Sequence, residues 1–509
     1  MRKTVRKICC ILTAFTLLGL TACTDLTVGG GFSSGNQIAN GTTGGSSDGN
    51  ATLTPLPEIP EAPEEENIVL PETLDFTPRE VTSQYGYRYF AGLQDGEKFC
   101  RFYIDLYNAC CGLSTEKDVL PIKQTVQDKD KNQYEVELYI VKTLAYGKYG
   151  LTDNEAVAVW KTFRAEYPEF YWIDNEVTYD NQVNYTLNLQ IFEEYATGAR
   201  RAAIKTALEA KANGCLDYLS ENMTATEMAL TIYDYVITSL QYAYKDDGET
   251  PEDAIWAHNV VGMAESGEGV CETYAKSFEY LCSLIGIDSL TVGGKAEQTG
   301  VKNIPEDAEK AAAYGHAWNV VKIDGVWYNV DATWGDQSTL YREWFGKGAT
   351  EFATTHVADT STDLSSIWQY PLPTLSEKTL SPVRMSESDG EEKMYGCIDY
   401  AFADITNEQG EYTITLHPDT SVTEDRETKI YLSKVSFETG VLPKAALIKF
   451  VGDYENLRPL DMHTENAVTL WSDIRLQDIA WTCPSIDKNG YAITGNSRSS
   501  YNKIKCVNF

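Results

Sequence analysis

Two stretches near the middle of the chain repeat apolar residues with the spacing of an amphipathic helix. The first begins at Thr224, and Glu227 lies three positions later, which is the pattern of a capping box. Its apolar face comprises Met228, Ile232, Tyr235 and Val236. The second begins at Cys271 and ends at Gly286, a residue that favours helix termination. Its apolar face comprises Tyr274, Ala275, Phe278, Leu281, Cys282 and Ile285. The pattern predicts helices over 224–240 and from 271 to about 285.

A β-hairpin follows these helices. Asp324 and Gly325 separate two runs of β-branched and aromatic residues, which is a strong signal for a two-residue hairpin turn. With that turn, Ile323 pairs with Val326. One face of the hairpin then presents a core-like set of side chains, namely Val321, Ile323, Tyr328 and Val330.

The other face of the hairpin carries polar groups. Counting outward from the turn places Trp318 opposite Asp331, and His316 lies two residues further along its strand. His316 and Asp331 are therefore predicted to be diagonal neighbours on one face, roughly 7–8 Å apart, within reach of an imidazole–carboxylate hydrogen bond.

The flanking regions have different patterns. Residues 80–222 mix helical spacing, over 97–111 and 155–167, with a strand-like alternation at Tyr134, Val136 and Leu138. After about residue 375, short alternating runs separated by Gly and Pro turns, including 429–437 and 446–451, predict a small β domain. The alternating residues of its first run are Tyr412, Ile414 and Leu416.

No metal site is predicted. The acidic and amide residues at 128, 130 and 132 resemble the start of a calcium loop, but Gln133 and Tyr139 stand where that loop needs Gly and a bidentate Glu. We interpret the segment as a solvated turn. His417 and His463 stand alone in the C-terminal region and are interpreted as surface or structural residues.

The length and charge of the chain narrow its function. At 509 residues it is long enough for two or three domains. Its 42 Lys and Arg residues against 75 Asp and Glu residues give a net charge of -33. Because phosphate binding needs clustered positive charge, this balance argues against nucleic acid as a partner.

The N-terminus has the pattern of an export signal. Basic residues precede an apolar run, 8–20, that is too short to be a permanent membrane span. The run ends in Leu-Thr-Ala-Cys at 20–23, which resembles the lipobox of bacterial lipoproteins and implies a lipid on Cys23. The alternative is an ordinary secretory signal. Residues 24–79 are rich in Gly, Ser, Pro and Glu, and we expect them to form a disordered tether.

The chain has 12 cysteines. Cys9 and Cys10 lie in the signal, Cys23 is the expected lipid site and Cys271 is a candidate nucleophile. The remaining eight are Cys100, Cys110, Cys111, Cys215, Cys282, Cys397, Cys483 and Cys506. An even remainder in an exported protein permits disulfides, but the sequence assigns no pairing.

Cys271 combines with the hairpin residues into a chemical hypothesis. At the start of a helix, unpaired amides and the helix dipole favour a thiolate. An imidazole beside that thiolate would keep it charged, which suits His316, and Asp331 would orient the imidazole. The competing interpretation is a buried structural cysteine with two ordinary polar residues on a hairpin.

Three motifs carry a resemblance to a known family. They are Gly-Val-Cys-x-x-Tyr-Ala at 269–275, His-Ala-Trp-Asn at 316–319 and Trp-Tyr-x-Val-Asp-x-Thr-Trp at 327–334. Together they resemble the transglutaminase-like superfamily, whose core is a papain-like cysteine fold. The resemblance covers about residues 224–358, and residues 166–172 resemble the region upstream of this domain in bacterial lipoproteins. It implies that Cys271 is the nucleophile, His316 the general base and acid, and Asp331 the residue that orients His316. Thr273 departs from a glycine frequent in the family.

The expected fold is α+β. It comprises a papain-like transglutaminase core at 223–360, a mixed region at 80–222 and a β-rich domain at 375–509. The expected function is a lipid-anchored, extracytoplasmic cysteine acyl-transfer enzyme that acts on protein or peptide amide bonds without a cofactor. Hydrolysis is favoured over crosslinking, and a non-catalytic binding or scaffold protein is the alternative.

Substrate contacts are less well defined by the sequence. Trp318 and Trp334 are expected to line the acyl site, as is Trp256, although each is a large apolar residue that could serve packing instead. The backbone amide of Cys271 is one expected oxyanion donor, with a second supplied by the side chain of Gln241 or of Asn259.

Overall fold

A computed structural model of the chain describes residues 68–415, apart from 114–116, 128–132, 181–182, 222, 298–303, 305–313, 337–341, 360–370, 378, 381–382, 389, 391, 396–400 and 403. Beyond residue 415 it describes 435–436, 445–451, 459–461, 473–477, 480–482 and 502–504. The expected signal, the lipid site at Cys23, the turn at 128–132, and His417 and His463 lie outside these residues.

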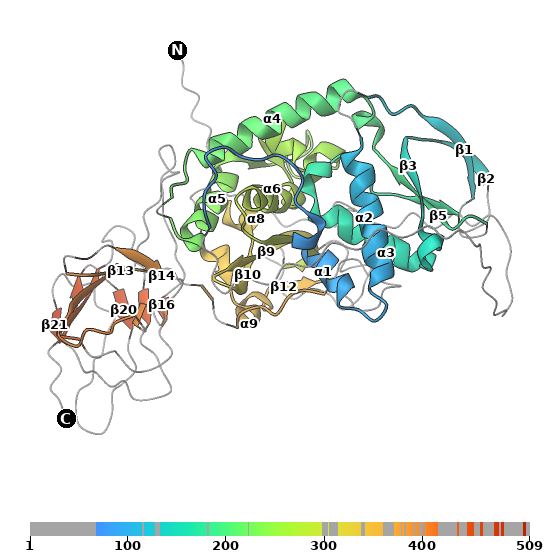
Figure 1. Cartoon of the computed structure of the whole chain (residues 1–509). Helices are drawn as coiled ribbons and strands as arrows, with labels where there is room; N and C mark the ends of the chain where they lie inside the picture. Colours follow the sequence, from blue (N-terminus) through green and yellow to red (C-terminus); the bar gives the residue numbers. More distant parts are fainter. Residues whose placement is uncertain are drawn as a thin grey trace, which may run out of the picture.

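The centre of the molecule is a helix packed on an antiparallel sheet (Figure 1). The five strands run in the order β11 (Phe345–Lys347), β10 (Val326–Val330), β9 (Gly315–Ile323), β8 (Ser289–Ala296) and β12 (His356–Ala358). All four neighbouring pairs are antiparallel. Helix α6 (Cys271–Leu284) packs on β8 and β9, and α5 (Ala225–Ser239) packs beside α6. The α+β fold predicted from the sequence is confirmed.

Both predicted helices form for the expected reasons. Thr224 caps α5 by accepting from the amide of Glu227, whose carboxylate accepts from the Thr224 amide in return. In α6, the predicted apolar face is buried, and Gly286 follows with a φ of +86°, the left-handed conformation in which glycine ends helices.

The predicted hairpin register is confirmed. Ile323 pairs with Val326, and Val330 pairs with Asn319. The predicted core face joins the main hydrophobic core. The opposite face is also covered, because a second buried cluster forms on it from Leu290, Val292, Trp318, Val320, Trp327 and Phe352. The polar residues of this face therefore lie in an enclosed environment.

The N-terminal region shares the core of the central unit. Its helices are α1 (Tyr85–Ala91), α2 (Glu97–Cys111), α3 (Asp153–Glu166) and α4 (Gly198–Leu216). Its strands are β1 (Ile122–Gln127), β2 (Gln133–Leu138), β3 (Ile140–Ala145), β4 (Thr178–Asp180) and β5 (Thr186–Gln190). One continuous buried cluster joins residues of these helices to α5, α6 and the hairpin. The two helices and the strand β2 that the sequence predicted are confirmed.

The chain before residue 80 also contacts this core. Ile68, Leu70, Leu74 and Phe76 are partly buried against it. Arg79 forms an ion pair of 3.0 Å with Asp288. Residues 68–79 therefore pack on the folded body, although their composition placed them in the tether. Isolated apolar side chains between prolines have no periodicity, so the pattern gave no sign of their burial.

The described residues of the C-terminal part lie mainly in strands. Six of them form one sheet in the order β14 (Lys393–Tyr395), β13 (Val383–Glu387), β15 (Glu411–Thr415), β17 (Leu447–Val451), β19 (Asp473–Gln477) and β21 (Asn502–Ile504). A second set comprises β16 (Val435–Ser436), β18 (Pro459–Asp461) and β20 (Ala480–Thr482). The strands β15, β17 and β19 are parallel to one another. In the described residues, no helix combines the length and the hydropathy needed to cross a bilayer.

Candidate active site

Cys271 is the first residue of α6 and is 1% exposed. It packs with Ala275 of its own helix and with Ala317, the residue that follows His316 on β9. Val270 precedes the helix and provides no capping side chain. The positive end of the helix dipole therefore acts on the Cys271 sulfur, which favours its anionic form.

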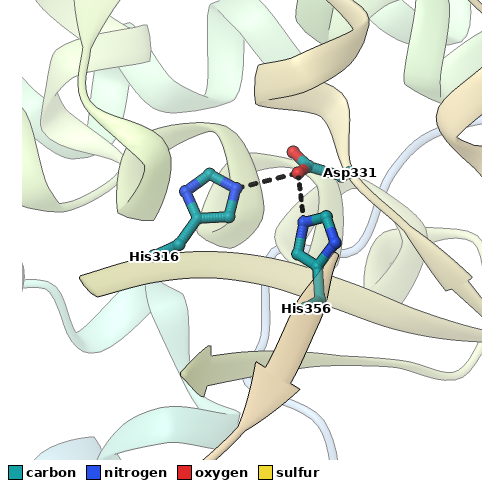
Figure 2. Close-up of side chains that lie close together, drawn as sticks. All are labelled: His316, Asp331 and His356. Carbon is teal, nitrogen blue, oxygen red and sulfur yellow. Dashed lines mark hydrogen bonds and ion pairs between the residues drawn. The ribbon is translucent and has the colours of Figure 1, made fainter. Parts of the chain in front are cut away.

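His316 and Asp331 are hydrogen bonded, as the hairpin register predicted. The His316 Nε2 atom lies 2.8 Å from Oδ2 of Asp331 (Figure 2). Asp331 follows β10 and caps the short helix α8 (Ala332–Gly335), where its Oδ1 accepts from the Trp334 amide at 3.0 Å. The His316 ring also interacts with the Cys271 side chain. Because Nε2 is engaged by Asp331, Nδ1 is the ring atom that remains for Cys271.

The charged forms of His316 and Asp331 stabilise each other. Burial disfavours a charged His316, but the Asp331 carboxylate and the bonds to Asp331 and Cys271 outweigh it and raise the pKa of His316 to about 10. Burial likewise opposes ionisation of Asp331, yet the two neighbouring histidines hold the pKa of that carboxyl well below its usual range. At neutral pH the pair is therefore an imidazolium beside a carboxylate.

A second histidine that the sequence analysis missed contacts the same carboxylate. His356 begins β12, is 3% exposed, and its Nε2 lies 3.2 Å from Oδ2 of Asp331 (Figure 2). It reaches the site because β12 pairs with β8, which in turn pairs with β9. These pairings join segments far apart in the chain, and the residues around His356 carry no motif, so no local signal identified it.

The two tryptophans proposed as substrate contacts differ in position. Trp318 is 2% exposed, and its ring lies 5.6 Å from that of Phe352 within the second cluster. Trp334 is only partly buried, and its ring lies 6.0 Å from that of His316. Trp334 is thus better placed to meet a substrate than Trp318. Trp256 packs against the small cluster of Ala243, Ala257 and Val270.

The two amide side chains considered as oxyanion donors also differ. The Asn259 amide nitrogen donates to the Ile255 carbonyl at 2.8 Å, and its oxygen accepts from the Val261 amide at 2.9 Å. Asn259 therefore shapes its own loop. Gln241 is exposed on β6 (Gln241–Tyr242), which pairs with β7 (Glu268–Gly269) just before Cys271. Gln241 stays the better candidate.

Thr273, which stands where the transglutaminase-like family frequently has glycine, forms hydrogen bonds with backbone groups. Its hydroxyl lies 2.6 Å from the Ala257 carbonyl and 3.0 Å from the Asn259 carbonyl. The side chain thereby ties the start of α6 to the preceding loop.

The side chains of His316, Asp331 and His356 are chemically suited to a metal ion, since one donor atom of each lies within 4.8 Å of the others. Nε2 of both histidines and Oδ2 of Asp331 already take part in the two hydrogen bonds described above. An ion would have to displace both bonds. The cysteines of the described residues, Cys100, Cys110, Cys111, Cys215, Cys271 and Cys282, form no disulfides, whereas Cys397, Cys483 and Cys506 lie outside those residues.

Part of the chain is similar to known proteins. Residues 206–332 match the family model described as the transglutaminase-like superfamily core. The chain is 26% identical over 149 residues to the kyphoscoliosis peptidase of Mus musculus, and 27% identical over 150 residues to that of Homo sapiens. The chain spans 21% of the length of each.

Solved structures include similar chains. One is a TGase, at 14% identity and a TM-score of 0.21, covering 29% of this chain and 40% of that one. Another is the periplasmic domain of TgpA from Pseudomonas aeruginosa, at 12% identity and a TM-score of 0.19, covering 29% and 54%. On the family match, residues 206–332 form a transglutaminase-like domain.

Proposed function

We propose that the transglutaminase-like domain of this chain is a cysteine acyl-transfer enzyme that acts on amide bonds of proteins or peptides. The observation that carries the proposal is the hydrogen bond between His316 and Asp331 beside Cys271 at the start of α6. A binding module would not need a buried imidazolium–carboxylate pair next to a helix-terminal thiol.

The first half of the reaction acylates Cys271. Its thiolate attacks the carbonyl carbon of the substrate amide, and the resulting oxyanion accepts from the Cys271 backbone amide. The second donor in this proposal is Gln241. His316 then gives its proton to the leaving nitrogen, the carbon–nitrogen bond breaks, and a thioester remains on Cys271.

The second half transfers the acyl group. The now neutral His316 takes a proton from water, and the resulting hydroxide attacks the thioester carbon. The carbon–sulfur bond then breaks, which releases a carboxylic acid and the Cys271 thiolate, and His316 keeps the proton as the imidazolium with which the next cycle begins. If an amine replaced water, the product would be a crosslink. We favour water, because no feature of the described residues selects an amine.

The location of the enzyme is part of the proposal. The sequence at 20–23 supports a lipid on Cys23 and attachment to the outer face of a bacterial membrane, with the body held away by residues of the tether. Growth with an alkyne-tagged fatty acid tests this point. Wild-type protein should carry the label and Cys23→Ala should not, whereas equal labelling of both would contradict the anchor.

The reaction is tested with an unfolded protein mixture as substrate. The full chain and Cys271→Ala are each incubated with the mixture, and mass spectrometry maps new N-termini, glutamine-to-glutamate conversions and isopeptide bonds. We expect new termini or conversions that depend on Cys271. Isopeptide bonds alone would identify an amine acceptor, and identical products from both proteins would refute the proposal.

A further inference from the structure

Two histidines from different strands converge on one oxygen atom. His316 on β9 and His356 on β12 both direct Nε2 at Oδ2 of Asp331, at 2.8 and 3.2 Å (Figure 2). The reaction described above uses only His316. His356 and Asp331 side chains are both fully buried, so their contact is not weakened by water.

The surroundings of His356 determine which nitrogen carries its proton. Its Nδ1 lies 2.8 Å from the Thr355 hydroxyl, whose other acceptor, the Phe352 carbonyl, is farther away at 3.3 Å. The shorter contact favours donation of the hydroxyl proton to Nδ1. A lone pair on Nε2 would face a carboxylate oxygen at 3.2 Å, and that contact would be repulsive. The favourable tautomer therefore has its proton on Nε2 and donates it to Asp331. Burial lowers the pKa of His356 despite the opposing effect of Asp331, which agrees with a neutral ring.

The role of His356 differs from that of the other donor to Asp331. The Trp334 amide already fixes the carboxylate through Oδ1. His356 instead shares the oxygen that His316 uses. A hydrogen bond donated to a carboxylate stabilises its charged form and lowers its affinity for a proton, so the bond from His356 weakens the pull of Oδ2 on the His316 proton. We infer that His356 is a positioning residue that acts through Asp331. Its hydrogen bond limits how strongly the Asp331 carboxylate stabilises the protonated form of His316.

This inference rests on the proposed function, because it concerns the step in which His316 gives its proton to the leaving nitrogen. An acid that must protonate a leaving nitrogen works best when it does not hold its proton too tightly. The titratable groups that face this carboxylate are His316, His356, Cys271 through His316, and Tyr233 of α5, whose hydroxyl donates to the Asp331 carbonyl. Among these groups, His356 is the one that donates to Oδ2 of Asp331 as a neutral ring.

The test compares two replacements of nearly equal shape. In His356→Gln the side-chain amide can still donate to Asp331, whereas His356→Met has a similar length and no donor. Both are made in the full chain with Cys271→Ala, so that His316 titrates without a coupled thiol. The titration of His316 is followed by NMR on protein with labelled histidine, and its signal is assigned from its loss in His316→Gln. Only five histidines are present, which keeps the spectrum simple.

We expect the His316 midpoint to rise by about half to one pH unit in His356→Met and to stay near the reference value in His356→Gln. An unchanged or lowered midpoint in His356→Met would overturn the inference, as would equal shifts in both variants, which would indicate packing. Should His356→Met fail to fold, Thr355→Val provides a second test. Loss of the hydroxyl donor to Nδ1 weakens the preference of His356 for the tautomer protonated on Nε2, so the His316 midpoint should rise by a smaller amount. An unchanged His316 midpoint in Thr355→Val would also overturn the inference.

The same measurement separates this inference from the proposed function. The His316 titration needs neither a substrate nor Cys271. Failure of Cys271-dependent turnover with a normal response in His356→Met would refute the enzyme but leave the shared carboxylate in place. Turnover with no response in His356→Met would refute the role of His356 alone.

Discussion

Replacing Asp331 with asparagine is the sharpest perturbation of the candidate site. The carboxylate accepts three hydrogen bonds, from His316, His356 and the Trp334 amide. An asparagine side chain offers one oxygen and one amino group. In either orientation its amino group therefore meets a buried N–H donor, unless a histidine changes tautomer. One such unmatched donor costs about 1–3 kcal/mol of folding free energy.

The electrostatic effect of this change has a defined pH window. Burial lowers the pKa of His316, and the Asp331 carboxylate makes the largest opposing contribution to its value of about 10, with a smaller one from Cys271. The pKa of His316 should therefore fall in the Asp331→Asn variant, which lacks that carboxylate. A raised histidine pKa contributes stability that is fully present below about pH 6.5 and is lost as the pH rises through about 10. The lowered pKa of Asp331 contributes stability above about pH 4. The variant should therefore be destabilised most between about pH 4 and 6.5, and less as the pH approaches 10.

The assay is the rate of Cys271 alkylation by iodoacetamide at pH 7.5, read by peptide mapping. A reference thiol of pKa about 8.5 is roughly one-tenth thiolate at this pH, so loss of the imidazolium should slow Cys271 by at least about tenfold. Asp336→Asn is the matched control, because Asp336 is a nearby carboxylate that accepts from the Tyr274 hydroxyl. Equal alkylation rates for wild type and Asp331→Asn would show that the Asp331–His316 pair does not activate Cys271.

Three further predictions concern the scaffold. Thr273→Val leaves two carbonyls without the hydroxyl donor and should lower the free energy of unfolding by about 1–3 kcal/mol in urea titrations; no change would show that the hydroxyl contributes nothing. Arg342→Met removes the ion-pair partner of the buried Asp234 carboxylate and should lower the free energy of unfolding by about 3–5 kcal/mol. Adding Asp234→Leu should restore part of that free energy. Burial raises the pKa of Glu166 to about 7, so wild type loses stability as the pH rises from about 4.5 to 7. Glu166→Gln should flatten the dependence of Tm between pH 5 and 8, and an unchanged slope would contradict the assignment.

The features predicted correctly from the sequence depend on short stretches of chain. The turn at Asp324 and Gly325 fixes the register of the whole hairpin, and this register brings His316 beside Asp331. The capping box at Thr224 similarly marks the start of α5. In both cases the residues that decide the structure are neighbours in sequence, so their pattern carries the information.

The features that were missed depend on contacts between distant segments. His356 enters the site only through the pairing of β12 with β8, which sets it opposite Ala296. The packing of residues 68–79 and the fusion of the N-terminal helices with the central core likewise require tertiary contacts that no local period predicts. The covered second face of the hairpin belongs to the same class, because Phe352 reaches Trp318 from beyond the hairpin.

The central claim, that His316 maintains Cys271 as a reactive thiolate, is tested most directly by site-resolved alkylation across pH 5 to 9. The buried thiols of Cys100, Cys110, Cys215 and Cys282 serve as internal references in the same digest. We predict that Cys271 reacts faster than a free thiol near neutral pH, and that His316→Ala abolishes this advantage while the four reference thiols keep their rates. Alkylation of Cys271 no faster than a free thiol, or unaffected by His316→Ala, would contradict this claim.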